Sequence, residues 1–369
     1  MQICICRVRV EYRTIEEWCE ILDSQRIPIT AKNRIEGPYP YYGANGIQDY
    51  VNDYIFDDEL VLLAEDGGNF GSKDRPIAYR VSGKCWVNNH AHVLKPKNDL
   101  DVDYLCYSLM FYNTNGLVNG ATRQKLTQST MRTMKIPCLE INEQQEIVQR
   151  IKKIESILND LNGQLELLDE LIKARFVEMF GDLRVNDKGW KYYKLDELTE
   201  LITDGEHATP KRTTQGIYLL SARNVLNHQL SLEDVDYIDY DEFSRISRRI
   251  IPREGDVLIS CSGSIGRCCV VPKNIKFQMV RSIALLRFKS NINPVFAEYM
   301  ITSDYLQDQI NKSKTVSSQA NLFQGKIKSL KGVVPPLELQ NQFASFVQEI
   351  DKSRLLSNHS LFLIKSIIF

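Results

Sequence analysis

The sequence predicts an α+β protein in which two similar globular α/β domains are separated by two long antiparallel coiled-coil helices. A long seam of apolar residues at heptad spacing predicts the first helix, and a second seam of the same phase follows 196 residues later, so that Phe343 corresponds to Ile147. Other segments match at or near the same shift. Two matched halves of this kind indicate an internal repeat of one fold.

The first seam lies within residues 142–180. Its apolar residues alternate at spacings of four and three, as the a and d positions of a coiled coil do. Asn142 can cap the start of the pattern and Gly181 follows its end, so one helix of about 39 residues is expected. The helix-pairing residues of this seam are Ile147, Ile151, Ile154, Leu158, Leu161, Leu165, Leu168 and Ile172.

The second seam keeps the same heptad phase but is weaker. Arg354 and Ser357 interrupt it, and the sequence ends at Phe369, so the second helix is expected to be shorter than the first. Because the two seams share their phase, we expect the helices to pack against each other within one chain. The helix-pairing residues of the second seam are Phe343, Val347, Ile350, Leu361, Ile364 and Ile368.

The repeat reaches into the globular parts with a variable shift. Residues 59–64 match 255–260 at a shift of 196, residues 15–21 match 195–201 at 180, and residues 88–91 match 281–284 at 193. Gln144 falls on Gln340 at the first of these shifts. The framework therefore repeats while the loops differ. The predicted division is a first domain at 1–138, a first helix at 139–183, a second domain at 184–338 and a second helix at 339–369.

Local patterns predict the short elements of the first domain. Apolar alternation predicts strands, and apolar residues at helical spacing predict amphipathic helices. Proline and glycine divide residues 27–58 into loop and strand. We expect strands at 1–10, 61–64 and 86–94, and helices at 11–22, 102–112 and 126–134.

The composition predicts a cytoplasmic protein that does not enter a membrane. Nine cysteines without regular spacing are typical of reduced thiols. No apolar stretch approaches the ~20 residues that cross a bilayer, and residues 1–10 carry too much charge for a signal peptide.

The net charge of −1 argues at first against nucleic acid. The charge is segregated, however. Residues 118–135, 263–281 and 311–331 carry basic residues and no acid, at matching places in the two halves. Local phosphate binding is therefore compatible with a neutral total.

Signatures of catalysis are missing. There is no Walker A motif and no G-x-G-x-x-G, and Pro335-Pro336 lacks the flanking residues with which DNA amino-methyltransferases hold a flipped base. His90, His92 and Cys85 lack a second pair of ligands. We expect no catalytic residue, no metal and no cofactor in this chain.

Several loops carry side chains suited to DNA. Asparagine and glutamine can read adenine, arginine can read guanine, and a helix N-terminus suits a phosphate. Any one of these stretches could also be a plain turn. The candidate DNA-binding residues are Tyr39, Tyr41, Tyr42, Asn45, Lys73, Asn89, Thr122, Arg123, Gln124, Lys125, His207, Lys211, Arg212, Arg223, Asn224, Ser264, Arg267, Arg281, Lys314, Ser317, Gln319, Asn321 and Lys326.

Taken together, these motifs resemble the specificity (S) subunit of a type I restriction–modification system. The match covers nearly the whole chain in the order domain, helix, domain, helix. The segments that carry it are residues 37–50, 136–147, 203–207, 255–260, 263–266 and 334–340.

The resemblance implies that each domain is a target recognition domain for one half of a split, asymmetric site in double-stranded DNA. It implies that the helices measure the spacer and dock two S-adenosylmethionine-dependent methyltransferase subunits, with ATP-driven restriction and translocase subunits joining the complex. The shorter, interrupted second helix departs from this pattern where the second methyltransferase would dock.

Two other functions remain open at this point. The chain could be a coiled-coil scaffold without DNA contact, although the matched basic loops argue against it. It could be a catalytic DNA-modifying enzyme, which would require the missing motif or a metal cluster.

Overall fold

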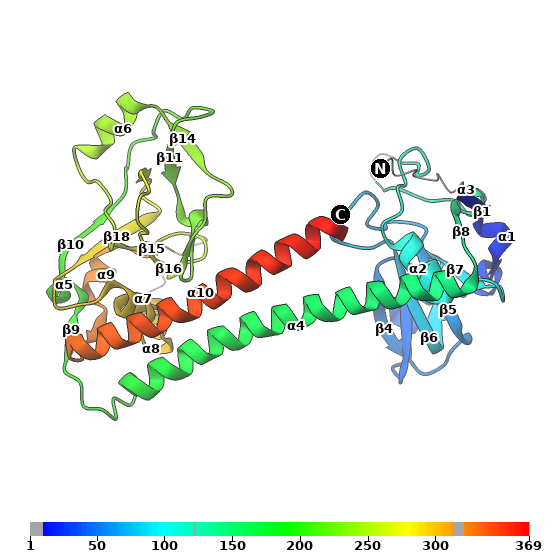
Figure 1. The fold of residues 1–369 in the computed structure, drawn as a ribbon, viewed down its shortest axis with the longest axis horizontal. Coiled ribbons are helices and arrows are strands. Elements are labelled where there is room, and N and C mark those ends of the chain that lie inside the picture. The colour runs from blue at the N-terminus through cyan, green and yellow to red at the C-terminus, as the bar shows by residue number, and fades with distance from the viewer. Residues whose placement is uncertain (1–9, 121–122, 313–320, 369) are drawn as a thin grey trace, which may run out of the picture. The chain divides into compact units, whose positions relative to one another are not determined.

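The computed structural model describes residues 10–120, 123–312 and 321–368 of the chain (Figure 1). The strand expected at residues 1–10 lies outside this part except for its last residue. The chain forms two compact units, residues 1–159 and 160–369, with the boundary inside the first long helix. Each unit is described by itself.

A six-stranded sheet organises the first unit. Its neighbours are antiparallel except β3 and β6, which run parallel. Residues 60–64 of the central strand are fully buried, because one face packs on helices and the other on a smaller apolar cluster. The strand order is β2 (Cys19–Ile21), β7 (Ala91–Pro96), β5 (Phe56–Ala64), β6 (Ala78–Val87), β3 (Tyr39–Gly43) and β4 (Gly46–Val51).

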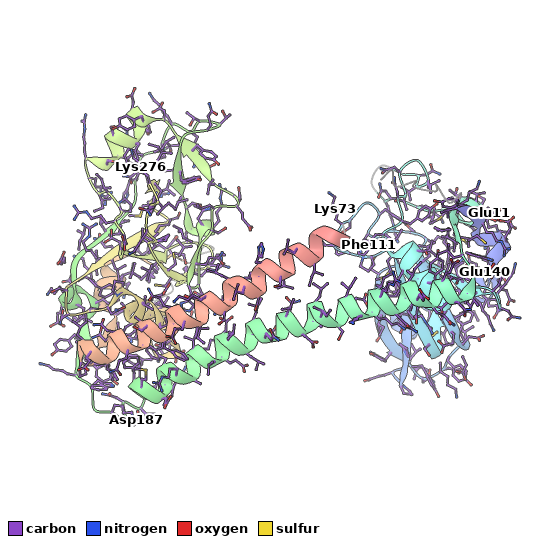
Figure 2. The ribbon with its side chains drawn as sticks, viewed as in Figure 1. Glu11, Lys73, Phe111, Glu140, Asp187 and Lys276 are labelled. Carbon is purple, nitrogen blue, oxygen red and sulfur yellow. The ribbon has the colours of Figure 1, made fainter. Side chains whose placement is uncertain are left out.

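The remaining elements of the first unit lie around this sheet. The helix expected at residues 11–22 is wrong, because this segment forms β1, a single helical turn and β2. The strand expected at 86–94 is two strands joined by a turn. Figure 2 labels Glu11 at the start of β1 and Glu140 next to the first long helix. The elements are β1 (Glu11–Thr14), α1 (Ile15–Trp18), η1 (Asp23–Gln25), η2 (Ala31–Asn33), α2 (Val102–Met110), α3 (Gln128–Thr133) and β8 (Lys135–Cys138).

The second unit contains a four-stranded sheet, a three-stranded sheet and two strand pairs. The four-stranded sheet consists of β10 (Thr199–Asp204), β18 (Ile283–Phe288), β15 (Val257–Ser260) and β16 (Cys268–Val270). The three-stranded sheet consists of β14 (Asp236–Ile238), β11 (Ile217–Leu220) and β17 (Phe277–Met279). The pairs are β12 (Val225–Leu226) with β13 (Gln229–Leu230) and β9 (Tyr192–Lys194) with β19 (Lys331–Val333).

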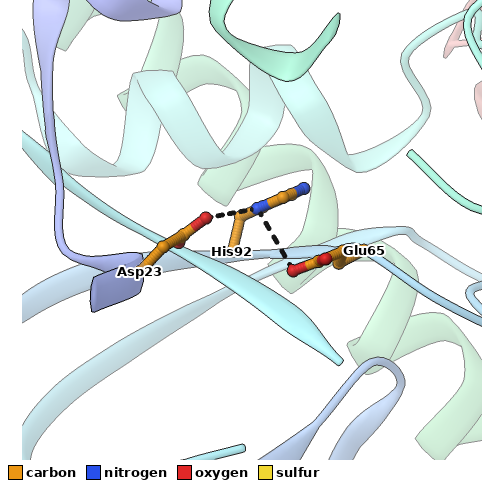
Figure 3. A group of neighbouring side chains, drawn as sticks. All are labelled: Asp23, Glu65 and His92. Atoms are coloured by element: carbon orange, nitrogen blue, oxygen red, sulfur yellow. Dashed lines mark hydrogen bonds and ion pairs between the residues drawn. The ribbon is translucent and has the colours of Figure 1, made fainter. Parts of the chain in front are cut away.

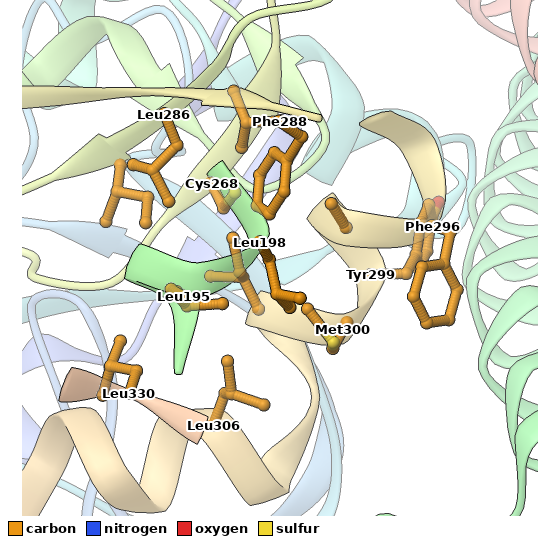
Figure 4. Packing of buried hydrophobic residues seen from close by; sticks show 14 of the residues in the cluster. Leu195, Leu198, Cys268, Leu286, Phe288, Phe296, Tyr299, Met300, Leu306 and Leu330 are labelled. Carbon is orange, nitrogen blue, oxygen red and sulfur yellow. The ribbon is translucent and has the colours of Figure 1, made fainter. Parts of the chain in front are cut away.

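Short helices complete the second unit. Figure 4 shows Phe296, Tyr299 and Met300 of the helix after β18 in the same apolar core as Leu195 and Leu198. The helices are α5 (Leu195–Leu198), η3 (Ala222–Asn224), α6 (Tyr240–Ser247), α7 (Pro294–Thr302), α8 (Asp304–Lys312) and α9 (Gln324–Ser329).

The two units repeat one framework down to single hydrogen bonds. The amide of Ile15 donates to the Met134 carbonyl at 2.9 Å, and the amide of Leu195 donates to the Leu330 carbonyl at 2.8 Å. In both units this residue begins a short helical turn between two strands. β10, the strand after the turn in the second unit, contains a register shift that β2 lacks. Residues of β2 therefore correspond to residues of β10 at a shift of 181 instead of 180.

The match of residues 88–91 with 281–284 is wrong by one residue. β5 pairs Ala64 with Ala91, and β15 pairs Ser260 with Ile283. Since Ala64 and Ser260 are equivalent, Ala91 corresponds to Ile283, which is a shift of 192 rather than 193.

A buried glutamine ties each long helix to its domain. The Gln144 side chain accepts from the Asp101 amide at 2.8 Å and donates to the carbonyls of Asp99 and Leu139 at 3.0 and 2.9 Å. Gln340 repeats this pattern with Asn293, Asn291 and Pro335 at 2.8, 3.3 and 2.8 Å. Both glutamines are fully buried.

We expect Gln144→Leu to destabilise the first unit by about 1–3 kcal/mol for each backbone group left without a partner. The measurement is urea denaturation followed by circular dichroism. Gln145→Leu is the matched control, because Gln145 is the exposed neighbour and such positions usually change stability by about 0.5 kcal/mol or less. Equal losses in the two variants would contradict the role of the buried amide.

The long helices are α4 (Ile141–Phe180, 40 residues) and α10 (Leu337–Ile368, 32 residues). Within the second unit Phe180 contacts Phe343, while Asp169 forms an ion pair with Arg354. Going back along α4 from Phe180 to Asp169, the contacted residue on α10 moves forward from Phe343 to Arg354. This part of the helix pair is therefore antiparallel. The predicted fold class is confirmed: α+β, a repeated domain and two long helices.

The members of the first seam are all buried or half-buried, as are the members of the second seam up to Ile364. The side chain of Ile368 lies outside the described residues. Ile147 packs on the core of the first domain. Arg354, the charged residue that interrupts the second seam, forms ion pairs with Asp169 of α4 and Asp351 of α10. Within the described residues no helix is long and apolar enough to span a bilayer.

Candidate nucleic-acid interface

Three loops of the first unit meet at the turn that follows β5. Asn45, in the β3–β4 turn, donates its side-chain amide to the Gly67 carbonyl at 3.0 Å. The Gly67 amide donates to the Gln124 carbonyl at 3.1 Å, and Arg123 contacts Asp66 at 2.6 Å. Gly67 has a φ of 70°, which favours glycine. The structure thus places Asn45, Arg123 and Gln124 on one surface.

The exposed candidates of this unit are Asn45, Lys73, Asn89, Arg123, Gln124 and Lys125. Lys73 is labelled in Figure 2. Although residues 118–135 contain no acid, the fold supplies acids from elsewhere: Arg123 contacts Asp66, and Lys125 contacts Glu65 at 3.2 Å. Thr122 lies outside the described residues.

The tyrosines of residues 39–42 are less accessible than expected. Tyr41 is 1% exposed, and its hydroxyl accepts from the Ile29 amide at 3.0 Å and donates to the Ile29 carbonyl at 3.2 Å. Tyr42 packs on Tyr79, and half-buried Tyr39 lies beside Tyr54. The segment is a strand and not a loop, so Tyr41 faces the core and the expectation of an exposed Tyr41 is wrong.

Beneath this surface lies a buried charged cluster, Asp23, Glu65 and His92 (Figure 3). His92 Nδ1 lies 2.7 Å from Asp23 Oδ2, and His92 Nε2 lies 2.9 Å from the Leu126 carbonyl oxygen. Each ring nitrogen of His92 thus lies within hydrogen-bond distance of an oxygen, so the ring is fixed at both ends inside the cluster.

The residue types of this cluster are metal ligands, but its charges are already compensated. Arg26 Nη1 lies 2.6 Å from Glu65 and also donates to the Ala91 carbonyl at 2.7 Å, while Arg26 Nη2 lies 3.5 Å from Asp23. A guanidinium between the two carboxylates takes the place that a cation would need. Cys85, which the sequence analysis considered together with His92 as a metal ligand, is not part of this charged cluster and lies in an apolar cluster.

The cluster lowers the pKa of Asp23. Burial by itself raises that pKa, but the hydrogen bond and charge of His92, the Val93 amide and the charge of Arg26 outweigh it. The same cluster holds the loop that carries the candidate residues, because the Leu126 amide donates to the Glu65 carbonyl at 2.8 Å. Asp23, Arg26 and Glu65 were missed from the sequence because they come from separate segments.

In the second unit three candidates meet at a cavity of about 380 Å³. His207, Arg281 and Asn321 line it, and His207 Nε2 lies 3.1 Å from Asp204 Oδ2. Its other lining residues, which sequence reasoning missed, are Asp204, Cys261, Ser262, Ser282, Ala284, Leu322, Phe323 and Gln324. Asp204 could have been found, because it lies within the motif at 203–207.

Among the described residues of the second unit, the other candidates do not line this cavity. Arg212 and Arg223 share Asp236 at 3.1 and 3.3 Å. The Lys211 amide donates to Glu242 at 3.1 Å, and the hydrogen bond from Arg245 lowers the pKa of Glu242 to about 2.

Asn224 is a buried structural residue, 2% exposed. It accepts from the Ser221 amide at 2.9 Å and donates to the Asp234 carbonyl at 2.9 Å. The expectation of an accessible Asn224 is therefore wrong.

Ser264, Arg267 and Lys326 complete the described candidates. Ser264 and Lys326 are exposed and Arg267 is half-buried. Within the described part of the chain no carboxylate lies within ion-pair distance of Arg267, Arg281 or Lys326. Lys314, Ser317 and Gln319 lie outside the described residues.

Comparison with known proteins places both halves in one family profile. The profile described as type I restriction modification DNA specificity domain matches residues 7–168 and 187–364. A protein from Haemophilus influenzae, designated a candidate type I restriction enzyme specificity subunit, is 29% identical over 374 residues, covering 95% of this chain and 89% of that protein.

Two solved structures share the fold. The S subunit of a type I restriction–modification system from M. genitalium has a TM-score of 0.58 at 14% identity, covering 98% of this chain and 95% of that chain. A chain from a study of complex assembly and conformational transition in a type I system has a TM-score of 0.52 at 14% identity, covering 97% and 95%. The profile matches twice, once in each half of the repeat.

Proposed function

This chain belongs to the family of type I restriction–modification DNA specificity proteins, and from this premise we propose that each globular domain reads one half of a bipartite, asymmetric target in double-stranded DNA. The paired helices set the length of the unread spacer and dock two methyltransferase subunits. Restriction and translocase subunits join through that complex. The chain itself supplies recognition, and the chemistry belongs to its partners.

The observation that carries the proposal is a repeated framework with different side chains at equivalent surface loops. The loop before α3 presents Arg123, Gln124 and Lys125, whereas the equivalent loop before α9 presents Asn321 beside a cavity. Two similar frameworks with different loops are suited to two related but unequal recognition tasks.

The helices carry features that support docking of protein partners. Large apolar side chains remain exposed on both helices in addition to the seams: Leu167, Leu171 and Val177 on α4 are 64%, 46% and 52% exposed. On α10, Leu355, Leu356 and Leu363 are 69%, 71% and 47% exposed. Grouped apolar exposure of this kind is characteristic of surfaces that bind other proteins.

A domain exchange tests the proposal. Residues 11–138 are replaced by the equivalent domain of a family member with a known target, the hybrid is expressed with its methyltransferase partner, and genomic methylation is sequenced. One half of the methylated site should change and the other should stay. A change in both halves, or in neither, would contradict independent reading.

We expect Lys326→Ala to weaken DNA binding by the methyltransferase complex on all sequences alike. A lysine that neutralises one phosphate should lower the slope of log affinity against log salt by about one unit. Lys328→Ala is the control on the same helix, because Lys328 is held by Asp196 at 3.3 Å. The measurement is affinity across a salt series, and equal slopes for the two variants would contradict a phosphate contact by Lys326.

A further inference from the structure

The buried cluster of the first unit and the cavity of the second occupy the same place in the repeated framework. Ile21 pairs with Leu94 in the first sheet, and Ile202 pairs with Leu286 in the second. Two residues further along the chain stand Asp23, just after β2, and Asp204, at the end of β10, which are therefore equivalent. The acid is kept in both units, and its surroundings differ.

Strand register and backbone hydrogen bonds identify the other equivalent positions. The Glu65 amide donates to the His90 carbonyl at 2.8 Å, and the Cys261 amide donates to the Ser282 carbonyl at 2.8 Å. Glu65 thus corresponds to Cys261. His92 lies two residues after His90, so it corresponds to the second residue after Ser282, which is Ala284.

The basic residue next to the acid also changes. Arg26 lies three residues after Asp23 and is 3.5 Å from it, whereas His207 lies three residues after Asp204 and is 3.1 Å from it. In the second unit all three replacements put a smaller side chain where the first unit has Arg26, Glu65 and His92. The shorter side chains leave the volume that appears as the cavity of about 380 Å³.

The two acids also differ in how many of their hydrogen-bonding positions are used. Asp23 accepts from the Val93 amide at 2.9 Å, from Gln128 at 2.9 Å and from His92 at 2.7 Å. Among the described residues, the cationic or ring partners of Asp204 are His207 at 3.1 Å and Arg249 at 3.8 Å. The Asp204 carboxylate therefore keeps lone pairs with which it can accept a hydrogen bond from a ligand in the cavity.

We propose that this cavity receives the amino-bearing edge of an adenine or cytosine in the second half of the DNA target, with Asp204 accepting from the exocyclic amine. The inference rests on the proposed function and assigns a specificity-determining residue to it. A carboxylate is a suitable acceptor for such an amine.

The lining favours a base edge over other ligands. Asp204 repels a phosphate, and Arg281 at the same cavity disfavours a metal cation. Phe323, 61% exposed, adds an aromatic surface, and Asn321 and Gln324 add amides. Mixed donors and acceptors with one aromatic ring form the kind of lining that a nucleobase needs.

Asp204→Ala removes both acceptor oxygens, whereas asparagine would keep one and could still accept from the amine. The target of the parental methyltransferase complex is first found by methylation sequencing, and affinities are then measured on duplexes that vary each base of that target. The variant should lose its preference for adenine or cytosine at one position of the second half-site, by roughly five- to 150-fold. The first half-site should be read as before.

A second variant closes the cavity by copying the first unit: Cys261→Glu, Ala284→His and His207→Arg together. It should lose the same base preference while thermal unfolding shows a folded chain. Asp241 is an exposed aspartate at the start of α6. Asp241→Ala is therefore the control for loss of one carboxylate in this domain and should keep the parental preference.

The outcomes separate the pocket from the function on which it rests. Unchanged base preference in both Asp204→Ala and the closed variant, beside intact selective binding by the parent, overturns the pocket alone. Absence of selective DNA binding by the parental complex overturns the proposed function and the pocket together. Loss of preference at the same single position in both variants, with the control unchanged, supports the pocket.

Discussion

Replacement of Phe343 by alanine is expected to lower the free energy of unfolding of the second unit by about 3–5 kcal/mol, the usual cost of removing a buried phenylalanine. Phe343 is fully buried where α10 begins. Its ring centroid lies 5.4 Å from Phe176, 5.6 Å from Phe180 and 5.2 Å from Tyr299, each nearly edge to face. Such pairs each add about 0.5–1.5 kcal/mol beyond burial. One ring thus joins α4, α7 and α10.

The control is Phe346→Ala on the same helix. Phe346 is half-buried, and the Arg175 guanidinium carbon lies 5.7 Å from the centroid of its ring. We expect Phe346→Ala to lower the free energy of unfolding clearly less than Phe343→Ala does. Urea denaturation gives the free energies, and hydrogen exchange along α10 reports release of the helix. Equal losses in the two variants would show that the ring cluster does not anchor α10.

The features that sequence predicted best depend on regular spacing. A heptad repeat specifies one face of a helix by itself, so α4 and α10 could be located without any knowledge of their partners. The buried residues of β5 and β15 were found because apolar runs bounded by loops mark central strands. Gln144 and Gln340 were matched by the repeat, although their hydrogen bonds to the domain could not be foreseen.

The features that sequence missed depend on distant contacts or on one-residue shifts. Residues 11–22 have helical spacing, but pairing of β1 with β8 and of β2 with β7 overrides it. Tyr41 was placed in a loop, and strand alternation turns it inward. The cluster around His92 joins Asp23, Glu65 and Leu126, and no local pattern connects three segments so far apart.

Removal of Arg26 is expected to be about as costly to the first unit as loss of Phe343 is to the second. Arg26→Ala leaves Glu65 and Asp23, whose side chains are 12% and 3% exposed, without their shared guanidinium. Removing one partner of a buried ion pair typically costs about 3–5 kcal/mol. Arg26→Lys should recover part of this loss, because an ammonium restores the charge but not the planar fork that reaches both Glu65 and the Ala91 carbonyl.

The loss should also depend on pH in a direction set by Asp23. Its pKa in the folded unit lies below the usual value, so its contribution to stability is present above the unfolded pKa of about 3.9 and disappears as the pH falls through the folded pKa. Arg26 is one of the charges that lower this pKa. The difference in unfolding free energy between parent and Arg26→Ala should therefore be largest near neutral pH and shrink below about pH 4. Denaturation curves from pH 7 down to about pH 3 measure it. A difference that stays constant across this range would show that Arg26 does not stabilise the unit through ionised Asp23, because that attraction must vanish when the carboxylate is protonated.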